Sequence, residues 1–132
     1  MKVIVIGGIA GGASFATRFR RLNEQNEILI LERGEHISIA SCALPYYLGG
    51  VITDRNALIE RTPAILKQNN NIDVRVRHEV TAIDPARHRL SVKNLDSGEQ
   101  YEETYDKLVL STGARPVLPP ISGIETATNA FT

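Results

Sequence analysis

The stretch Val3-Ile-Val-Ile-Gly-Gly-Ile-Ala-Gly-Gly-Ala-Ser-Phe-Ala16 decides the fold of this 132-residue chain. Its β-branched residues predict a buried strand over 2–6, and four glycines then predict a tight turn. The segment 11–23 lacks proline and repeats apolar residues at helical spacing, so it predicts a helix. A second apolar strand, 27–31, ends on Glu32. Such a unit places a pyrophosphate on a helix N-terminus and a ribose on the acid, so it predicts a dinucleotide site.

The glycine spacing departs from G-x-G-x-x-G at one place. Gly7 is the first glycine and Gly12 the third, but Ile9 occupies the second position. Because the second glycine normally lets the backbone approach the pyrophosphate, we expect the Ile9 side chain to turn away or the contact to shift. Glu32, about 20 residues after the last glycine, favours a nucleotide site over a purely structural turn.

The composition limits the class of protein. The length fits one domain with a core, and a formal net charge of zero gives no argument for a nucleic-acid or membrane partner. No apolar run approaches the roughly 18 residues that cross a bilayer, and the N-terminus lacks a signal-peptide pattern. A cytoplasmic protein is the simplest interpretation, and a lone thiol, Cys42, suits a reducing compartment. The three histidines show no metal-ligand spacing, so no metal site is predicted.

The first helix has two distinct faces. Phe15, Phe19 and Leu22 are expected to pack on the sheet. Polar residues recur at the same spacing on another side: Ser14, Arg18 and Arg21. That polar stripe is either a solvated face or a strip that recognises phosphate.

The lone cysteine lies near a predicted helix start. Ser41 has the character of an N-cap and Pro45 fits the first turn, so we expect a short helix from about Cys42 to Gly49-Gly50. At the positive end of that helix dipole the thiolate would be favoured. The alternative is a small buried core cysteine.

The rest of the chain extends the first unit into an α/β fold. Residues 54–70 predict an interrupted helix with Thr62 as N-cap, and 72–76 predict a strand that returns to the sheet. Three alternating segments predict an antiparallel meander: 80–83, 89–95 and 100–105. A buried strand, 107–111, then leads into a proline-rich tail.

Four pieces match one family in order and spacing. They are Gly7–Gly12 with Glu32, Cys42 ten residues after that acid, His78-Glu79-Val80, and Thr112-Gly113-Ala114. Together they resemble the FAD-dependent pyridine nucleotide–disulfide oxidoreductases of the single-cysteine kind, and the run 41–50 is similar to the coenzyme A–disulfide reductase branch. The resemblance implies a Rossmann-like, glutathione-reductase-like FAD-binding domain over 1–115. Its parallel sheet would carry an inserted β-meander at about 79–105, and 116–132 would link to an absent NAD(P)H-binding domain.

The resemblance also implies roles for individual residues. Cys42 would be the redox-active cysteine. FAD would be held by Gly7, Gly8, Ile9, Ala10, Gly11, Gly12, Glu32, Arg33, Val80, Thr112, Gly113 and Ala114. Coenzyme A would be held by Ser14, Arg18, Arg21, Ser38 and Ser41, which strengthens the phosphate interpretation of the polar stripe.

The implied reaction passes electrons from NAD(P)H through FAD to Cys42, and on to coenzyme A disulfide or a related small disulfide or persulfide. We expect the full-length enzyme to be a homodimer, and this chain alone to be inactive with an incomplete FAD site. One alternative is part of an NADH oxidase or peroxidase, in which Cys42 cycles through a sulfenic acid. Another is a nucleotide-binding module without catalysis.

Overall fold

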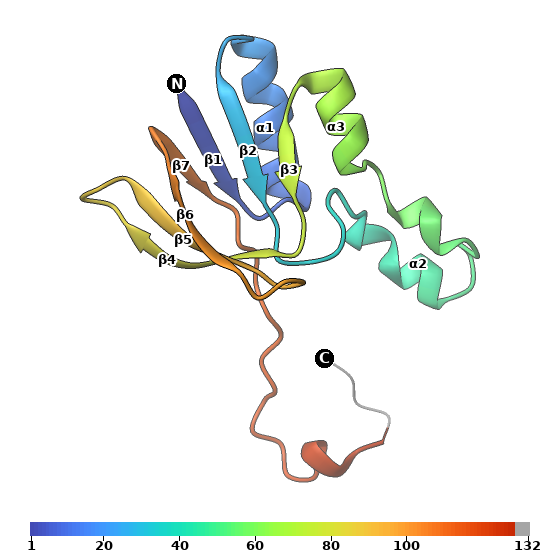
Figure 1. Cartoon of the computed structure of the whole chain (residues 1–132). Helices are drawn as coiled ribbons and strands as arrows, with labels where there is room; N and C mark the ends of the chain where they lie inside the picture. Colours follow the sequence, from blue (N-terminus) through green and yellow to red (C-terminus); the bar gives the residue numbers. More distant parts are fainter. Residues whose placement is uncertain (129–132) are drawn as a thin grey trace.

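The computed structural model describes residues 1–128, which form two sheets with helices on one side (Figure 1). The strands are β1 (Lys2–Ile6), β2 (Glu27–Leu31), β3 (Asp73–Arg75), β4 (His78–Asp84), β5 (Arg89–Asn94), β6 (Gln100–Thr104) and β7 (Lys107–Leu110). The α-helices are α1 (Ala10–Leu22), α2 (Leu44–Leu48) and α3 (Pro63–Asn70). Short 3₁₀ turns are η1 (Ser41–Ala43), η2 (Arg55–Leu58) and η3 (Ile124–Thr126).

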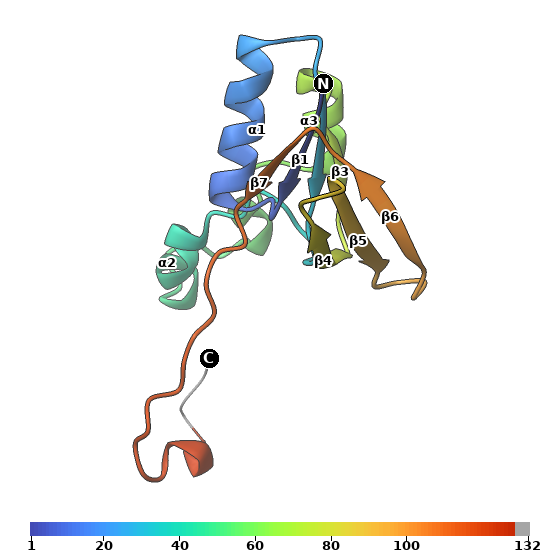
Figure 2. The same ribbon diagram turned by 90° about the vertical axis from the view of Figure 1, so that its left-hand side faces the viewer.

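The central sheet is parallel, with strand order β3-β2-β1-β7. Its middle strands are covered on both faces, which is why they consist almost wholly of Val, Ile and Leu. Val5, Ile28 and Ile30 point into the core beneath α1 and α3. Ile4 and Leu29, which alternate with them, point into a second core beneath the meander. The result is three layers, with helices, parallel sheet and meander stacked in that order (Figure 2).

The predicted antiparallel meander is confirmed as β4-β5-β6. An ionic cluster ties it to the parallel sheet: Glu103 of β6 accepts hydrogen bonds from Lys2 of β1 and Arg75 of β3. Burial raises the pKa of the Glu103 carboxyl, but these two cations outweigh burial and hold its pKa below the ordinary value of 4.5. The carboxylate form is therefore the one that the fold prefers.

The predicted interruption between residues 54 and 70 is also confirmed. The 3₁₀ turn η2 precedes α3, and the Thr62 hydroxyl caps α3 by accepting from the Ile65 N–H at 3.3 Å. Asn71 ends α3 in the left-handed conformation, with φ of 47°. This end leads into β3, and so delivers the chain back to the parallel sheet.

The expected packing of Leu22 on the sheet is wrong, because its side chain is 68% exposed. Phe15 and Phe19 do pack on the core. In the last turn of α1 the inward position belongs to Arg20, which is buried and donates to the carbonyls of Glu24 and Asn71. The aliphatic stem of Arg20 therefore closes this end of the helix interface.

Beyond β7 the chain leaves the three layers and runs as an exposed tail to η3 (Figure 1). The last part of the segment expected to be a linker, residues 129–132, lies outside the described residues.

Candidate functional site

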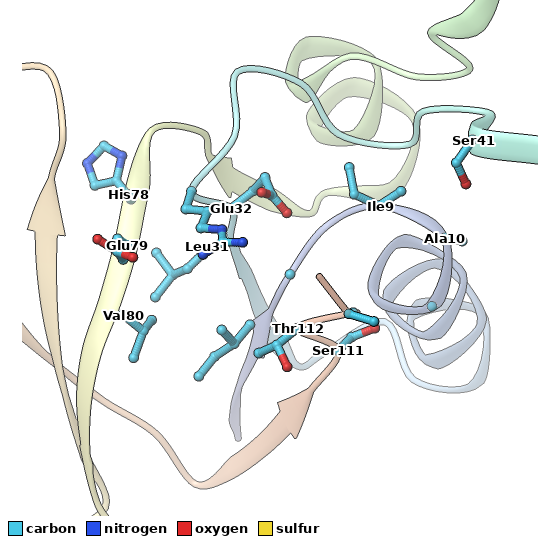
Figure 3. A pocket seen from close by; sticks show the side chains of 16 residues that line it. Ile9, Ala10, Leu31, Glu32, Ser41, His78, Glu79, Val80, Ser111 and Thr112 are labelled. Carbon is cyan, nitrogen blue, oxygen red and sulfur yellow. The ribbon is translucent and has the colours of Figure 1, made fainter. Parts of the chain in front are cut away.

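A cavity of about 570 Å³ opens at the carboxyl ends of β1, β2 and β7 (Figure 3). Strand β1 lies between β2 and β7, so the strand order reverses at this point. Open α/β sheets bind ligands in the crevice at such a reversal. The cavity is lined by Ile6, Gly7, Ile9, Ala10, Gly11, Leu31, Glu32, Arg33, Ser41, His78, Glu79, Val80, Ser111, Thr112, Gly113 and Ala114.

The glycine turn brings the start of α1 to the cavity wall. Gly7 has φ of +94°, and a Cβ there would lie 2.1 Å from the Ser111 carbonyl oxygen. A Cβ on Gly12 would lie 1.8 Å from the Gly7 carbonyl oxygen, so only glycine allows the helix to pack this closely on the turn. The N-terminus of α1 has no side-chain cap at Ile9. Its first backbone N–H groups are therefore suited to receive an anion.

Glu32 is fixed at the end of β2 by two backbone donors. It is only 7% exposed, and its two carboxylate oxygens accept from the N–H groups of Gly8 and Gly34, each at 2.7 Å. Each oxygen keeps a further lone pair, so the carboxylate can also accept from a ribose hydroxyl. The same side chain thus organises the glycine turn and faces the cavity.

The opposite wall comes from segments far along the chain. His78, Glu79 and Val80 come from β4, and His78 Nδ1 donates to the Val76 carbonyl at 2.7 Å. Residues 112–114 follow β7 and turn at Gly113, which has φ of +69°. Ten of the twelve residues expected to hold the cofactor line this cavity. The other two, Gly8 and Gly12, are buried behind the turn.

Cys42 is exposed and adjoins a residue of the cavity wall. Ser41 is on the cavity wall, and Cys42 directly follows it with an exposed side chain. The alternative of a buried core cysteine is therefore wrong. The predicted cap is also wrong: Ser41 and Cys42 belong to η1, Ala40 precedes it without a side-chain cap bond, and α2 begins only at Leu44. Pro45, which lacks an N–H, takes the first turn of α2 and leaves the preceding residues in a tighter 3₁₀ turn.

A second hollow, of about 450 Å³, lies between α1 and the residues that precede and form α3. Three of the five residues expected to hold a substrate line it: Ser14, Arg21 and Ser38. Ser41 lines the first cavity instead, and Arg18 is exposed but lines neither.

Sequence reasoning did not single out several other residues of the second hollow. These are Ala13, Thr17, Glu60, Arg61, Leu66 and Asn69; Asn70 also lines it. Thr17 lies at helical spacing from Ser14 and Arg21, and this spacing was a usable signal. Residues 60 and 61 carried no such signal, because an isolated bridge between Ile39 and Ile59 brings them here.

The described residues form neither a metal-ligand group nor a membrane-spanning helix. Within residues 1–128, no group of three or more His, Cys, Asp and Glu side chains could hold a metal ion. None of the helices formed by those residues is long and apolar enough to span a membrane.

The fold and the first cavity define a dinucleotide-binding α/β protein with an inserted β-meander. The sequence model described as pyridine nucleotide-disulphide oxidoreductase matches residues 1–132, and the chain belongs to that family. A coenzyme A disulfide reductase of Staphylococcus aureus (strain Newman) is 44% identical over 113 residues, which are 86% of this chain and 26% of that protein. The chain therefore spans about a quarter of the length of that curated relative.

Solved structures agree with this assignment. Reduced CoADR-RHD of Bacillus anthracis superposes with a TM-score of 0.90 at 50% identity, over 96% of this chain and 23% of that one. An NAD-dependent persulfide reductase from A. fulgidus superposes with a TM-score of 0.88 at 42% identity, over 95% and 23%. A water-forming NADH oxidase from Lactobacillus brevis superposes with a TM-score of 0.85 at 34% identity, over 95% and 28%. The Rossmann-like fold with its inserted meander is thereby confirmed.

Proposed function

We propose that this chain is the FAD-binding part of an NAD(P)H-dependent flavoprotein that reduces a small disulfide or persulfide through Cys42. The observation that carries the proposal is the position of that thiol: Ser41 lines the dinucleotide cavity and the exposed Cys42 follows it directly. A thiol placed there can meet both a cofactor in the cavity and a substrate from solvent. Similarity to a coenzyme A disulfide reductase and a persulfide reductase supports the same reaction class.

The residues of the cavity fit FAD. Gly7 and Gly11 line the cavity without side chains, beside the uncapped N-terminus of α1, so a pyrophosphate can approach the backbone N–H groups there. Glu32 would accept from the adenosine ribose, and Arg33 lies beside it at the rim. The Val80 backbone would meet the adenine, and residues 112–114 would form the second flavin-binding turn. When bound, FAD supplies two-electron transfer between NAD(P)H and a disulfide.

The work of Cys42 is thiol–disulfide exchange. Its thiolate attacks one sulfur of the substrate disulfide, forms a mixed disulfide with that half, and releases the other half as a thiolate. Two electrons and a proton then break the mixed disulfide, which restores Cys42 and releases the second thiol. The exposure of Cys42 gives a bulky disulfide access to the attacking sulfur.

The acceptor we favour is coenzyme A disulfide, with a related persulfide as the close variant. Ser14 and Arg21 of α1 line the second hollow together with Ser38, and Arg18 is exposed on the same helix; hydroxyls and guanidiniums of this kind bind phosphate oxygens. In the whole protein, residues 1–115 would be the FAD-binding unit, residues 116–132 would lead to an NAD(P)H-binding domain, and two copies would form a homodimer.

The test is adduct formation on the chain itself. Reduced protein is incubated with coenzyme A disulfide, and the mixed disulfide is measured by intact-mass spectrometry. We expect one coenzyme A per wild-type chain and none on Cys42→Ser. If added FAD occupies the neighbouring cavity, the rate of adduct formation should fall five-fold or more. If the chain reacts with dithionitrobenzoate but not with coenzyme A disulfide, coenzyme A is the wrong acceptor.

A second candidate function is oxidation chemistry at the same thiol, because the Lactobacillus brevis relative is an NADH oxidase. In that case Cys42 would react with peroxide and persist as a sulfenic acid. Brief peroxide treatment followed by dimedone labelling distinguishes the two. A stable dimedone adduct on Cys42 without a coenzyme A adduct would favour the oxidase-type function.

A further inference from the structure

Tyr101 of β6 contacts both ends of the turn that carries the chain from β3 into β4. Arg75, the last residue of β3, donates to the Tyr101 hydroxyl at 2.9 Å, and its guanidinium carbon lies 5.5 Å from the centre of the Tyr101 ring. His78, the first residue of β4, meets the same ring edge to face, with the two ring centres 6.0 Å apart. Cation–π and edge-to-face contacts are both attractive, so the three side chains hold one another in place. We call Arg75, Tyr101 and His78 the brace.

The backbone of the same turn is bonded to Glu32. The Glu32 N–H donates to the Arg75 carbonyl at 3.0 Å, and the His78 N–H donates to the Glu32 carbonyl at 2.9 Å. Between them, Arg77 has φ of +59° and donates its N–H to the Gly34 carbonyl at 3.0 Å. A left-handed conformation is uncommon for a residue with a side chain and persists where the surroundings enforce it. The brace therefore fixes the two residues that bond the backbone of the acid in the first cavity.

The position of His78 also decides where one wall of that cavity lies. Its Nδ1 donates to the Val76 carbonyl at 2.7 Å, so the imidazole is held between this carbonyl and the Tyr101 ring. Residues 78–80 line the first cavity, on the side opposite the start of α1 (Figure 3). A displacement of His78 would therefore move this wall relative to Glu32.

Tyr101 itself is anchored away from any ligand. Its ring packs against the core between the meander and the parallel sheet, and it is not one of the residues that line the first cavity. Arg75 is paired with Glu103, which also accepts from Lys2. The brace is thus connected to the ionic cluster that ties the two sheets together. Its effect on a ligand is exerted through His78 and the turn.

We propose that Tyr101 is a positioning residue for the adenosine end of the dinucleotide site. It sets the separation of Glu32, which would accept from the ribose, and the β4 wall, where the Val80 backbone would meet the adenine. A ligand that contacts both walls binds more tightly when their separation is fixed beforehand, because binding then orders fewer groups. The inference rests on the proposed function for the identity of the ligand, whereas the brace is formed by this chain's own residues.

The test measures binding of ADP, which is the half of FAD that this end would hold, to the folded 132-residue chain by amide chemical shifts. Tyr101→Leu should weaken ADP binding about five-fold, as loss of one aromatic contact predicts. Tyr101→Phe keeps the ring and should bind within about two-fold of wild type. Tyr105→Leu is the matched control, because Tyr105 packs against the same core but stacks on His88, and it directly precedes a residue bonded to the start of β1, the end opposite the cavity. Its ADP affinity should stay within about two-fold of wild type.

A double-variant cycle separates positioning from stability. Because Tyr101 acts through His78, the combined His78→Leu and Tyr101→Leu variant should bind ADP about as well as His78→Leu alone. Urea unfolding of each variant ensures that affinities are compared for folded protein. If Tyr101→Leu does not fold, Arg75→Gln takes its place, since it removes only the exposed side of the brace; it should weaken ADP binding about three-fold.

Equal ADP affinities of Tyr101→Leu and Tyr105→Leu would overturn the inference, and so would losses that add in the double variant. A wild-type chain that does not bind ADP would overturn both the inference and the assignment of the first cavity to FAD. The reaction of Cys42 with coenzyme A disulfide is a separate readout. Loss of ADP binding in Tyr101→Leu but not in Tyr105→Leu supports the brace, and if no coenzyme A adduct forms, only the proposed acceptor is overturned.

Discussion

Replacing Glu32 by glutamine tests whether this acid organises the glycine turn before any nucleotide binds. Both carboxylate oxygens accept a backbone N–H at 2.7 Å, from Gly8 and Gly34. Glutamine offers one oxygen and one NH₂ group, so one backbone N–H would face another donor. Losing one hydrogen bond to a charged acceptor costs about 1.5–3 kcal/mol, and making the other neutral costs about 1 kcal/mol more. We therefore expect Glu32→Gln to lower the free energy of unfolding by about 3 kcal/mol in the absence of ligand.

Urea unfolding followed by far-ultraviolet circular dichroism measures this change. With a slope of about 2 kcal/mol per molar urea, the midpoint should fall by about 1.5 M. Glu79→Gln is the matched control, because Glu79 also lines the cavity but makes no side-chain hydrogen bond within residues 1–128; its effect should stay within about 0.5 kcal/mol. A Glu32→Gln variant as stable as this control would refute the claim that Glu32 stabilises the glycine turn. Ligand binding would then be the only role left for Glu32.

Three further predictions concern stability. Gly12→Ala should cost at least about 3 kcal/mol or prevent folding, because its Cβ would lie 1.8 Å from the Gly7 carbonyl oxygen; a native-like melting curve would contradict this close packing. Glu103→Gln should cost about 1 kcal/mol at pH 7. Because the folded-state pKa of Glu103 is lowered, its contribution is present above pH 4.5 and is lost as the pH falls through the lowered value, so wild type and variant should converge in acid. A difference that stays constant with pH would exclude the ion pairs as its cause. Thr62→Ala should cost about 1 kcal/mol through loss of the α3 cap, whereas Thr53→Ala, at an exposed position outside the helices and strands, should change little.

Short-range patterns allowed the main elements to be predicted. The strands β1 and β2, the glycine turn and α1 follow from residues that lie within a few positions of one another. The Thr62-Pro63 start of α3 and the alternating strands of the meander are local signals of the same kind. The errors arose where a local rule competed with packing: Leu22 has helical spacing toward the core, but Arg20 fills that position.

The position of Cys42 shows the limit of such reasoning. An N-cap and a proline suggested a helix start at the thiol, and the sequence left both a buried and an accessible cysteine open. The structure places it in η1, exposed and beside the cavity wall. Exposure depends on what packs over a side chain, and this is not encoded by its neighbours in sequence.

The sequence by itself determined the dinucleotide unit, because strand alternation, glycine conformation and helix spacing all act over a few residues. Tertiary structure alone decided which distant segments complete it: β4 and residues 112–114 meet the first turn only because both sheets pack around shared cores. It also decided that Glu32 is held by two backbone donors, and that a single bridge carries Arg61 to the hollow behind the turn. Such contacts between distant residues depend on the packing of the whole chain, and no local pattern records them.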